Sequence, residues 1–211
     1  MQVIQLLLSG ILAFSCAYQN KPAVVFKINN LMHENLELAT LGGGCFWCVE
    51  AIYQDLRGVH SVLPGYSGGT PETANYKAVC SGTTDHVEII QIKFDPQEIS
   101  FAEILEIFWS THNPTTPNRQ GNDVGPQYRS AIFYHSETQR AVAEQSIKEV
   151  APKFWSDKIV TEVVPFEAFY EAEDYHQNYY KSVGSRNPYC TMIITPKVEK
   201  FRKAYKDKLK N

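Results

Sequence analysis

The fold of this chain is decided by residues 38–50, which read LATLGGGCFWCVE. The first four residues are mostly apolar and predict a strand, which runs into three glycines. Glycine adopts backbone angles that other residues avoid, and it lets a ligand approach the main chain closely. After the glycines, Val49, Ile52, Tyr53 and Leu56 recur at helical spacing. The stretch therefore predicts a strand, a glycine turn and a helix.

Cys45 lies where the predicted strand ends and the helix begins. The free N–H groups and the positive end of the helix dipole at that position favour a thiolate. Two aromatic residues, Phe46 and Trp47, follow it directly. We therefore predict a reactive nucleophile of low pKa, where the alternative is a buried thiol that only packs.

Length and composition predict one globular domain. The chain has 211 residues, of which 44% are hydrophobic and 20% are charged, so it can form a sizeable core. A net charge of −3 argues against nucleic-acid binding. No stretch reaches the length of a membrane-spanning helix.

The N-terminus has the pattern of an export signal. Residues 3–14 are mostly apolar, and a polar segment follows Cys16. Residues 12–16, LAFSC, are similar to a bacterial lipobox, which would make Cys16 the lipidated first residue of the mature chain. We expect a signal peptide over residues 1–16 and a periplasmic protein or membrane-anchored lipoprotein. Residues 1–3 carry no Lys or Arg, so a cytoplasmic protein with a disordered tail is the alternative.

The remaining chain predicts a tether over residues 17–36 and a single catalytic domain over residues 37–211. Ser100 and Ser136 open capping boxes of two helices. An amphipathic helix is expected in a long C-terminal extension. Further strands are predicted over 59–66, with a break at Pro64, and over 87–94, 130–134 and 159–164. Strands and helices mix without regular alternation, which predicts an α+β fold: a two-layer sandwich of a mixed or antiparallel sheet with packed helices.

Glu88 occupies an unusual position in the strand predicted over 87–94. Period two places its side chain on the same side as Ile90, Ile92 and Phe94. A carboxyl group on an apolar strand face is a candidate functional residue, although a solvated strand-end glutamate is the alternative.

Five segments, in order, resemble the peptide methionine sulfoxide reductase A family. They are GCFW at 44–47, GYSGG at 65–69, NYKAVCSG at 75–82 with HVE at 86–88, QGNDVGPQYRS at 120–130, and YEAEDYHQ at 170–177. The match covers the chain from about residue 38 to residue 200. It implies a ferredoxin-like core and an enzyme that reduces methionine sulfoxide, free and in oxidised proteins, with a preference for the S epimer at sulfur.

The resemblance also implies roles for individual residues. Cys45 would attack the sulfur, and Glu88 would protonate the oxygen, which requires a carboxyl pKa raised by burial. Substrate binding would involve Phe46 and Trp47 as the seat of the methyl group, Tyr76 and Tyr128 as hydrogen-bond donors to the oxygen, and Asp123 in the long loop. Supporting roles are expected for Glu50 and His86, whereas His176 and Cys80 are expected to be structural.

Attack would leave Cys45 as a sulfenic acid, which a second thiol must convert to a disulfide. Cys48 forms a C-x-x-C with Cys45, and Cys190 resembles the family's C-terminal resolving cysteine. We favour Cys190 because a tail cysteine can move to meet the nucleophile, and a relay through both thiols stays open. The resemblance implies a thioredoxin-type reductant, no bound cofactor and no metal. A monomer is expected.

Two rival functions fit parts of the sequence. A thiol–disulfide oxidoreductase would use Cys45 and Cys48. That function would leave four residues without a role: Tyr76, Glu88, Asp123 and Tyr128. A zinc-binding module would need four ligands, and no second C-x-x-C or pair of histidines at ligand spacing is present.

Overall fold

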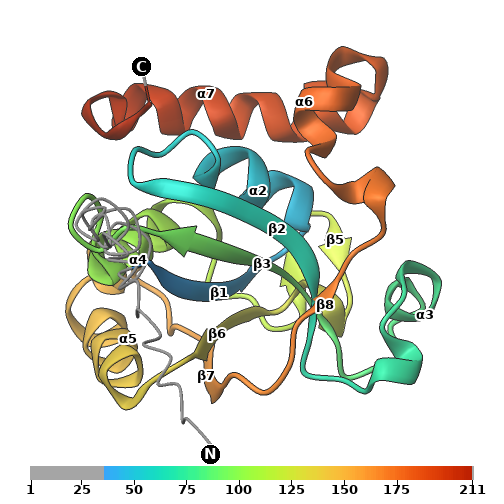
Figure 1. Ribbon diagram of the computed structural model, residues 1–211, viewed down its shortest axis with the longest axis horizontal. Coiled ribbons are helices and arrows are strands. Elements are labelled where there is room, and N and C mark those ends of the chain that lie inside the picture. The colour runs from blue at the N-terminus through green and yellow to red at the C-terminus, as the bar shows by residue number, and fades with distance from the viewer. Residues whose placement is uncertain (1–35, 211) are drawn as a thin grey trace, which may run out of the picture. The chain divides into compact units, whose positions relative to one another are not determined.

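The structure, a computed structural model, describes residues 36–210. These residues form a six-stranded sheet with helices packed against it (Figure 1). The predicted signal peptide with Cys16 and residues 17–35 of the predicted tether lie outside the described residues. Among the described residues, no helix has the length and apolar character needed to span a bilayer.

The sheet is antiparallel except at one edge. Its order is β7-β6-β1-β3-β2-β8, and β6 pairs in parallel with β7. The strands are β1 (Glu37–Gly43), β2 (Val59–Ser67), β3 (Val87–Phe94), β6 (Ser130–Tyr134), β7 (Glu162–Pro165) and β8 (Tyr170–Glu171). A separate hairpin joins β4 (Arg119–Gln120) to β5 (Asp123–Val124). The predicted α+β class with a mixed sheet is confirmed.

Six α-helices are present among the described residues, besides several short 3₁₀ and π-helical turns. They are α2 (Phe46–Tyr53), α3 (Tyr76–Cys80), α4 (Phe101–Thr111), α5 (Glu137–Glu149), α6 (Tyr179–Val183) and α7 (Thr195–Ala204). The predicted capping box opens α4, because Ser100 and Glu103 exchange side-chain-to-backbone hydrogen bonds. At α5, Ser136 caps the Gln139 N–H, but the Gln139 side chain accepts from the His135 N–H instead.

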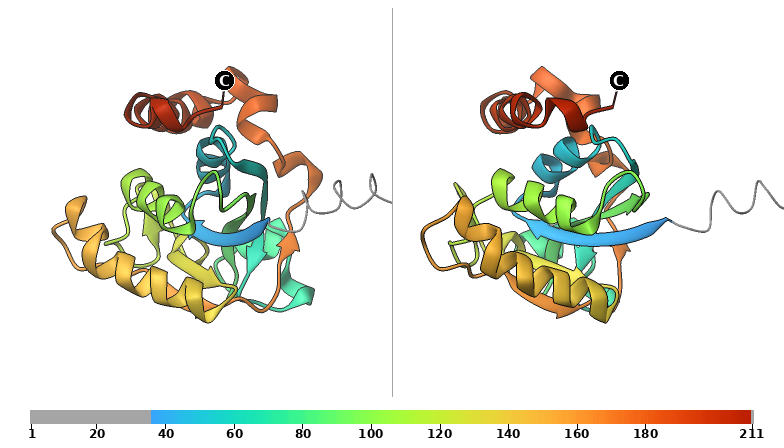
Figure 2. Two further views of the ribbon diagram at one scale, coloured as in Figure 1. Left: turned by 60° about the vertical axis from the view of Figure 1, so that its left-hand side comes forward. Right: turned by 90° about the vertical axis from the view of Figure 1, so that its left-hand side faces the viewer.

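The main core lies between the sheet and helices α2 and α4. Alternation along β3 directs Ile90, Ile92 and Phe94 into this core, whereas Val87 and Ile89 belong to a smaller cluster. Figures 1 and 2 show α2 and α4 between the sheet and α7. Helix α2, which begins next to Cys45, is therefore packed between the sheet on one side and α7 on the other.

The C-terminal extension packs back onto the helices. The segment Cys190–Ile194 forms a π-helical turn that leads into α7. Val198 and Phe201 of α7 are buried, which confirms the predicted amphipathic helix lying on the domain. Leu209 forms a β-bridge with Leu56, so the end of the extension is also attached to the domain.

Two predicted strand limits are wrong. Strand β2 continues through Pro64, which lies opposite Ile90 of β3. The Pro64 carbonyl accepts from the Ala172 N–H, so this residue turns its hydrogen-bonding side away from β3 and no N–H is needed there. Strand β7 begins at Glu162, later than predicted, because the Val160 N–H bonds to Pro114 outside the sheet.

Candidate active site

Cys45 is the N-cap residue of α2 and is buried, with 8% of its surface exposed. The preceding Gly44 has a φ of +87°, a conformation that glycine adopts without strain. A Cβ atom at Gly44 would lie 2.5 Å from the side chain of Gln120. The glycine turn therefore fixes Cys45 between β1 and α2 and lets the β4–β5 hairpin pack directly against the main chain.

Glu88 lies beside the nucleophile position on β3 and is only 2% exposed. Its carboxylate accepts a hydrogen bond from the Phe46 N–H at 3.1 Å, the residue next to Cys45. Burial raises the pKa of Glu88 to about 8, although this hydrogen bond lowers it in part. At neutral pH the carboxyl group is therefore mostly protonated and can donate a proton.

The two thiols of the C-x-x-C have opposite pKa shifts. Burial, followed by a hydrogen bond with Cys48 and the charges of Cys48 and Glu88, raises the pKa of Cys45 well above its ordinary value. The hydrogen bond from Cys45 and the charge of Lys197 lower the pKa of Cys48 against the effect of burial. The predicted low pKa of Cys45 is therefore not found, because burial outweighs the helix terminus.

Two tyrosines predicted to bind the sulfoxide oxygen lie near this pair. Tyr76 begins α3, and its N–H donates to Glu173 at 2.9 Å. Tyr128 ends the 3₁₀ turn that follows β5. Burial and then nearby groups, including the charges of Glu88 and Cys45, raise the pKa of both phenols, so the tyrosines remain hydrogen-bond donors.

Asp123 lies on β5 and is engaged by the C-terminal extension. Its carboxylate accepts a hydrogen bond from the Tyr189 hydroxyl at 2.8 Å. The same hydroxyl lies 3.8 Å from the Cys48 sulfur. Tyr189 thus joins the hairpin to the thiol pair.

Aromatic rings line the space next to Cys45. The Phe46 ring is buried and lies 5.0 Å from His176, whose Nδ1 accepts from the Trp47 indole N–H at 3.1 Å. Trp47 stacks on Tyr179 with ring centroids 3.7 Å apart and an angle of 7°. His176 also packs 4.4 Å from Tyr76. These rings can hold a small apolar group beside the thiol.

Glu50 and His86 lie outside the reacting centre. Glu50 is buried on α2 and accepts hydrogen bonds from the N–H groups of Asn178 at 2.7 Å and Tyr179 at 3.2 Å, where the extension begins. The His86 ring bonds to the Thr70 carbonyl at 3.0 Å. Glu50 therefore holds the extension, and His86 holds the loop after β2.

The other two cysteines of the described chain differ in their neighbours. Cys190 is fully buried, and burial and the charge of Cys48 raise its pKa. Cys80 is half-buried; burial raises its pKa, which hydrogen bonds with Tyr76 and Tyr128 partly lower. All four described cysteines are free thiols.

Sequence reasoning missed three residues of the site. Tyr189 directly precedes Cys190, and this position beside a candidate resolving cysteine is the one feature of the sequence that could have pointed to it. Glu173 accepts from Tyr76 and also from the Tyr66 hydroxyl at 3.0 Å, and it lies within a motif that had been quoted without a role. Gln120 also lay within a quoted motif, but its contact with Gly44 depends on tertiary packing.

The assembled groups suit thiol chemistry on a small polar substrate with an apolar part. A buried thiol, a protonated carboxyl group and tyrosine donors meet beside aromatic rings. Across residues 36–210, no group of three His, Cys, Asp or Glu side chains is arranged to hold a metal ion.

Comparisons with known proteins agree on one family. A sequence model described as peptide methionine sulfoxide reductase matches residues 37–209. The peptide methionine sulfoxide reductase MsrA of Saccharolobus solfataricus is 57% identical over 175 residues, which cover 83% of this chain and 98% of the relative. The protein of the same name from Thermus thermophilus is 50% identical over 174 residues, 82% of this chain and 98% of the relative.

Solved structures give the same result. Reduced Mxr1 from Saccharomyces cerevisiae superposes with a TM-score of 0.67 at 35% identity, covering 72% of this chain and 88% of that one. Methionine sulfoxide reductase A of Corynebacterium diphtheriae superposes with a TM-score of 0.63 at 31% identity, covering 71% and 76%.

Proposed function

The chain belongs to the peptide methionine sulfoxide reductase A family, and we propose that it reduces methionine sulfoxide with Cys45 as nucleophile and Glu88 as acid. The observation that carries this assignment is the buried carboxyl group of Glu88, which bonds to the residue next to Cys45. The substrates are oxidised proteins and free methionine sulfoxide, with a preference for the S epimer at sulfur.

The reaction begins with attack of the Cys45 sulfur on the sulfoxide sulfur. Glu88 donates its proton to the oxygen as the S–O bond weakens, because a neutral oxygen leaves more easily than an anionic one. Tyr76 and Tyr128 donate hydrogen bonds to the same oxygen, and Phe46 and Trp47 hold the methyl group. A Cys45–sulfur bond forms as the oxygen, having taken one proton from Glu88 and one from the Cys45 thiol, leaves as water. A water molecule then attacks the Cys45 sulfur, so that the thioether leaves as methionine with the electron pair of that bond, Cys45 becomes a sulfenic acid, and the released proton returns to Glu88.

Cys48 is the first resolving thiol in our proposal, in contrast to the preference for Cys190 drawn from the sequence. Cys48 lies in the first turn of α2, where its N–H donates to the Cys45 carbonyl at 3.1 Å and its side chain shares a hydrogen bond with the Cys45 thiol. Its sulfur is therefore close enough to attack the sulfenic acid. Water leaves and a Cys45–Cys48 disulfide forms. Cys190 is fully buried at the start of the turn that leads into α7, and we assign it the second exchange, in a relay.

Electrons come from a thioredoxin-type reductant, and the chemistry requires no bound cofactor. The reductant's dithiol opens the disulfide by exchange and is itself oxidised. Cys45 and Cys48 are then available for the next cycle.

We also propose three further features of the protein: a ferredoxin-like core, export with lipidation, and a monomeric state. The strand order β6-β1-β3-β2, with helices α2 and α4 on one face, supports classification as a ferredoxin-like core. The apolar N-terminus with Cys16 supports export and lipidation, which fractionation of cells expressing wild-type and Cys16→Ser chains would test. A monomer is expected, and light scattering would measure its mass.

The function is tested by assaying the purified chain on both epimers of methionine sulfoxide with a thioredoxin system. We expect methionine from the S epimer and none from the Cys45→Ser variant. Insulin reduction serves as the competing assay for a thiol–disulfide oxidoreductase. Faster reduction of insulin than of the sulfoxide would overturn the proposal.

A further inference from the structure

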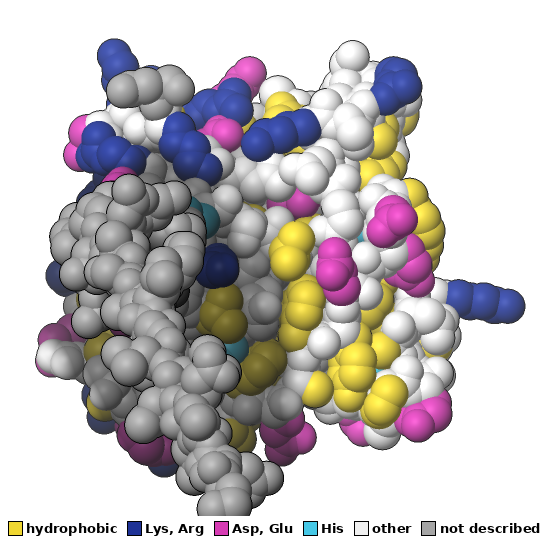
Figure 3. Space-filling view, viewed as in Figure 1, with side chains coloured by type: hydrophobic (Ala, Val, Ile, Leu, Met, Phe, Trp, Pro, Cys, Tyr) yellow, Lys and Arg dark blue, Asp and Glu magenta, His cyan; other side chains and the backbone are white. Residues whose placement is uncertain are grey.

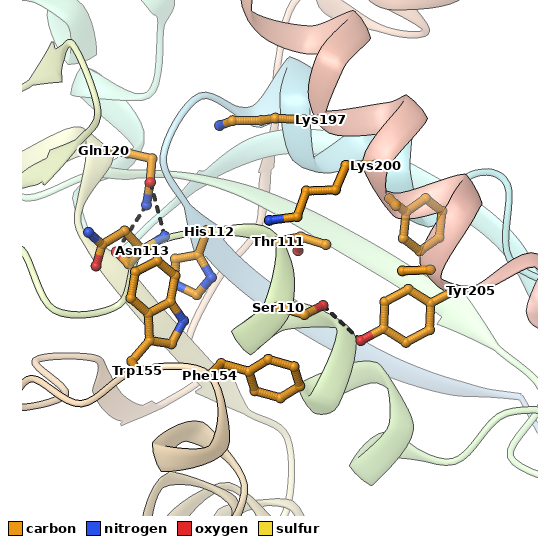
Figure 4. Close-up of a pocket in the computed structure, with 12 residues that line it drawn as sticks. Ser110, Thr111, His112, Asn113, Gln120, Phe154, Trp155, Lys197, Lys200 and Tyr205 are labelled. Atoms are coloured by element: carbon orange, nitrogen blue, oxygen red, sulfur yellow. Dashed lines mark hydrogen bonds between the residues drawn. The ribbon is translucent and has the colours of Figure 1, made fainter.

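A pocket of about 420 Å³ lies between α7 and the segment that follows α4 (Figure 4). Its volume is within the usual range for small-ligand sites. In the reaction described above no side chain of this pocket contacts the substrate, although, after the hydrogen bond with Cys45, the charge of Lys197 lowers the pKa of Cys48, and Gln120 packs on Gly44. Its chemistry therefore calls for a separate explanation.

Two lysines give this pocket a positive charge. Figure 4 shows Lys197 and Lys200 extending from α7, the first toward Gln120 and the second toward Thr111. Among the residues that line the pocket there is no Asp or Glu. Within residues 36–210, neither lysine forms a salt bridge. His112 adds no charge, because burial lowers its pKa to about 4.

The helix that carries the two lysines is rich in positive charge. Figure 3 shows Lys and Arg side chains gathered over α7 with fewer Asp and Glu among them, although the whole chain has a net charge of −3. An anionic group is therefore attracted to this part of the molecule.

An aromatic wall faces the lysines. Phe154 is 40% exposed at the pocket. Trp155 is fixed by the hydrogen bond from its indole N–H to the Trp109 carbonyl at 2.7 Å, and Tyr205 by its bond with Ser110 at 2.9 Å. Fixed rings opposite lysines suit a ligand with an apolar stem and an anionic end.

The pocket borders the candidate active site through Gln120. The Gln120 side chain exchanges two hydrogen bonds with the main chain of Asn113, at 3.0 and 3.1 Å, and packs on Gly44. Gln120 pairs in the hairpin with Asp123, which bonds to Tyr189 at the thiols. A polypeptide held at Cys45 can therefore reach the pocket across this hairpin.

We propose that the pocket is a subsite for protein substrates that binds the carboxylate side chain of a Glu or Asp near the oxidised methionine. This inference rests on the proposed function. The carboxylate lies between Lys197 and Lys200, and its methylene stem packs on Phe154. Free methionine sulfoxide occupies only the Cys45 site and gains nothing from the pocket.

The test uses peptides with one oxidised methionine and a single Glu at successive positions on either side, each paired with a Gln peptide. At one or more positions we expect KM for the Glu peptide to be roughly three- to fivefold lower at low ionic strength, with kcat unchanged. Lys200→Glu should abolish this preference and favour the corresponding Lys peptide. Lys203→Glu, on an exposed residue of α7 outside the pocket, is the matched control and should keep the preference.

Two results would overturn the subsite. One is equal KM for the Glu and Gln peptides at every position while the sulfoxide is reduced normally. The other is a Lys200→Glu effect confined to KM for thioredoxin, which would assign this face to the reductant. Absence of any sulfoxide reduction would instead contradict the proposed function, so the two failures can be told apart.

Discussion

Glu88 is almost completely buried, and its carboxylate accepts a hydrogen bond from the main chain of Phe46, the residue next to Cys45. Burial alone would favour replacement by an apolar residue, since an ionised buried carboxylate is costly. A carboxyl group of raised pKa is useful where a proton must be donated at neutral pH. The residue therefore belongs to the chemistry more than to the stability of the fold.

Glu88→Gln should lower kcat by about 10²- to 10⁴-fold, the usual contribution of a general acid. Gln keeps an oxygen to accept from the Phe46 N–H, so the site should stay folded. In the wild type, the acid form is populated below the pKa of about 8, so the rate should fall as the pH rises past that value. The variant should lack this limb of the pH–rate profile. An unchanged limb in the Gln variant would assign it to another group.

The two candidate resolving thiols should respond differently to substitution. We expect Cys48→Ser to release methionine once and then fail to recycle with thioredoxin, because the thiol that bonds to Cys45 is gone. Cys190→Ser should still form the first disulfide, detected by peptide mapping after stoichiometric oxidation. The opposite pattern would restore Cys190 as the first resolver.

At the scale of elements, the turn between β1 and α2 depends on close contact with the β4–β5 hairpin. Gly44→Ala should destabilise the protein by about 1–3 kcal/mol and lower activity, since the new methyl group meets Gln120 and the φ of +87° becomes strained. Thermal unfolding and the sulfoxide assay measure both effects.

Gly121→Ala is the matched control for that substitution. Gly121 also has a positive φ, +61°, but no atom lies within 4 Å of its Cβ position. The Gly121→Ala variant should therefore lose stability only through its strained backbone angle, without a steric clash. Equal losses in the two variants would mean that the Gln120 contact contributes nothing.

Glu50 connects α2 to the start of the extension. Glu50→Ala leaves the N–H groups of Asn178 and Tyr179 without their acceptor, which should cost about 2–4 kcal/mol. In Glu50→Ala, amide hydrogen exchange over residues 178–183 should become faster. The rate at which thioredoxin recycles the enzyme should change as well. Glu50→Gln retains an acceptor oxygen and should exchange more slowly than the Ala variant. Unchanged protection in Glu50→Ala would contradict this role.

Local signals predicted the elements that depend on local interactions. Alternation located β3, and the capping Ser100 located the start of α4. The two-residue strands β4, β5 and β8 are too short to show a period. The passage of β2 through Pro64 depends on which partner each backbone group faces, and that is set by the sheet rather than by the neighbouring sequence.

At the scale of the whole molecule, the sequence motifs predicted candidate reacting groups that lie close together in the structure, but they did not predict the electrostatics of those groups. The helix terminus at Cys45 suggested a low pKa, whereas burial under the extension raises it. The contact of Tyr189 with Asp123 joins residues 66 positions apart and has no local signature. Both depend on how the extension returns over α2, which no single segment of the chain determines.

The reaction cycle links these parts in one sequence of events. Substrate meets the thiol and the acid at the base of α2, and the disulfide forms beside the extension. The reductant must then reach the Cys48 sulfur, which lies 3.8 Å from the Tyr189 hydroxyl of the extension.

The most direct measurement of the central claim is to react the Cys48→Ser/Cys190→Ser double variant with one equivalent of methionine sulfoxide and trap sulfenic acids for mass spectrometry. The account predicts one methionine released per chain and a trapped sulfenic acid on Cys45. Release of no methionine, or oxygen found on Cys80 instead, would contradict it.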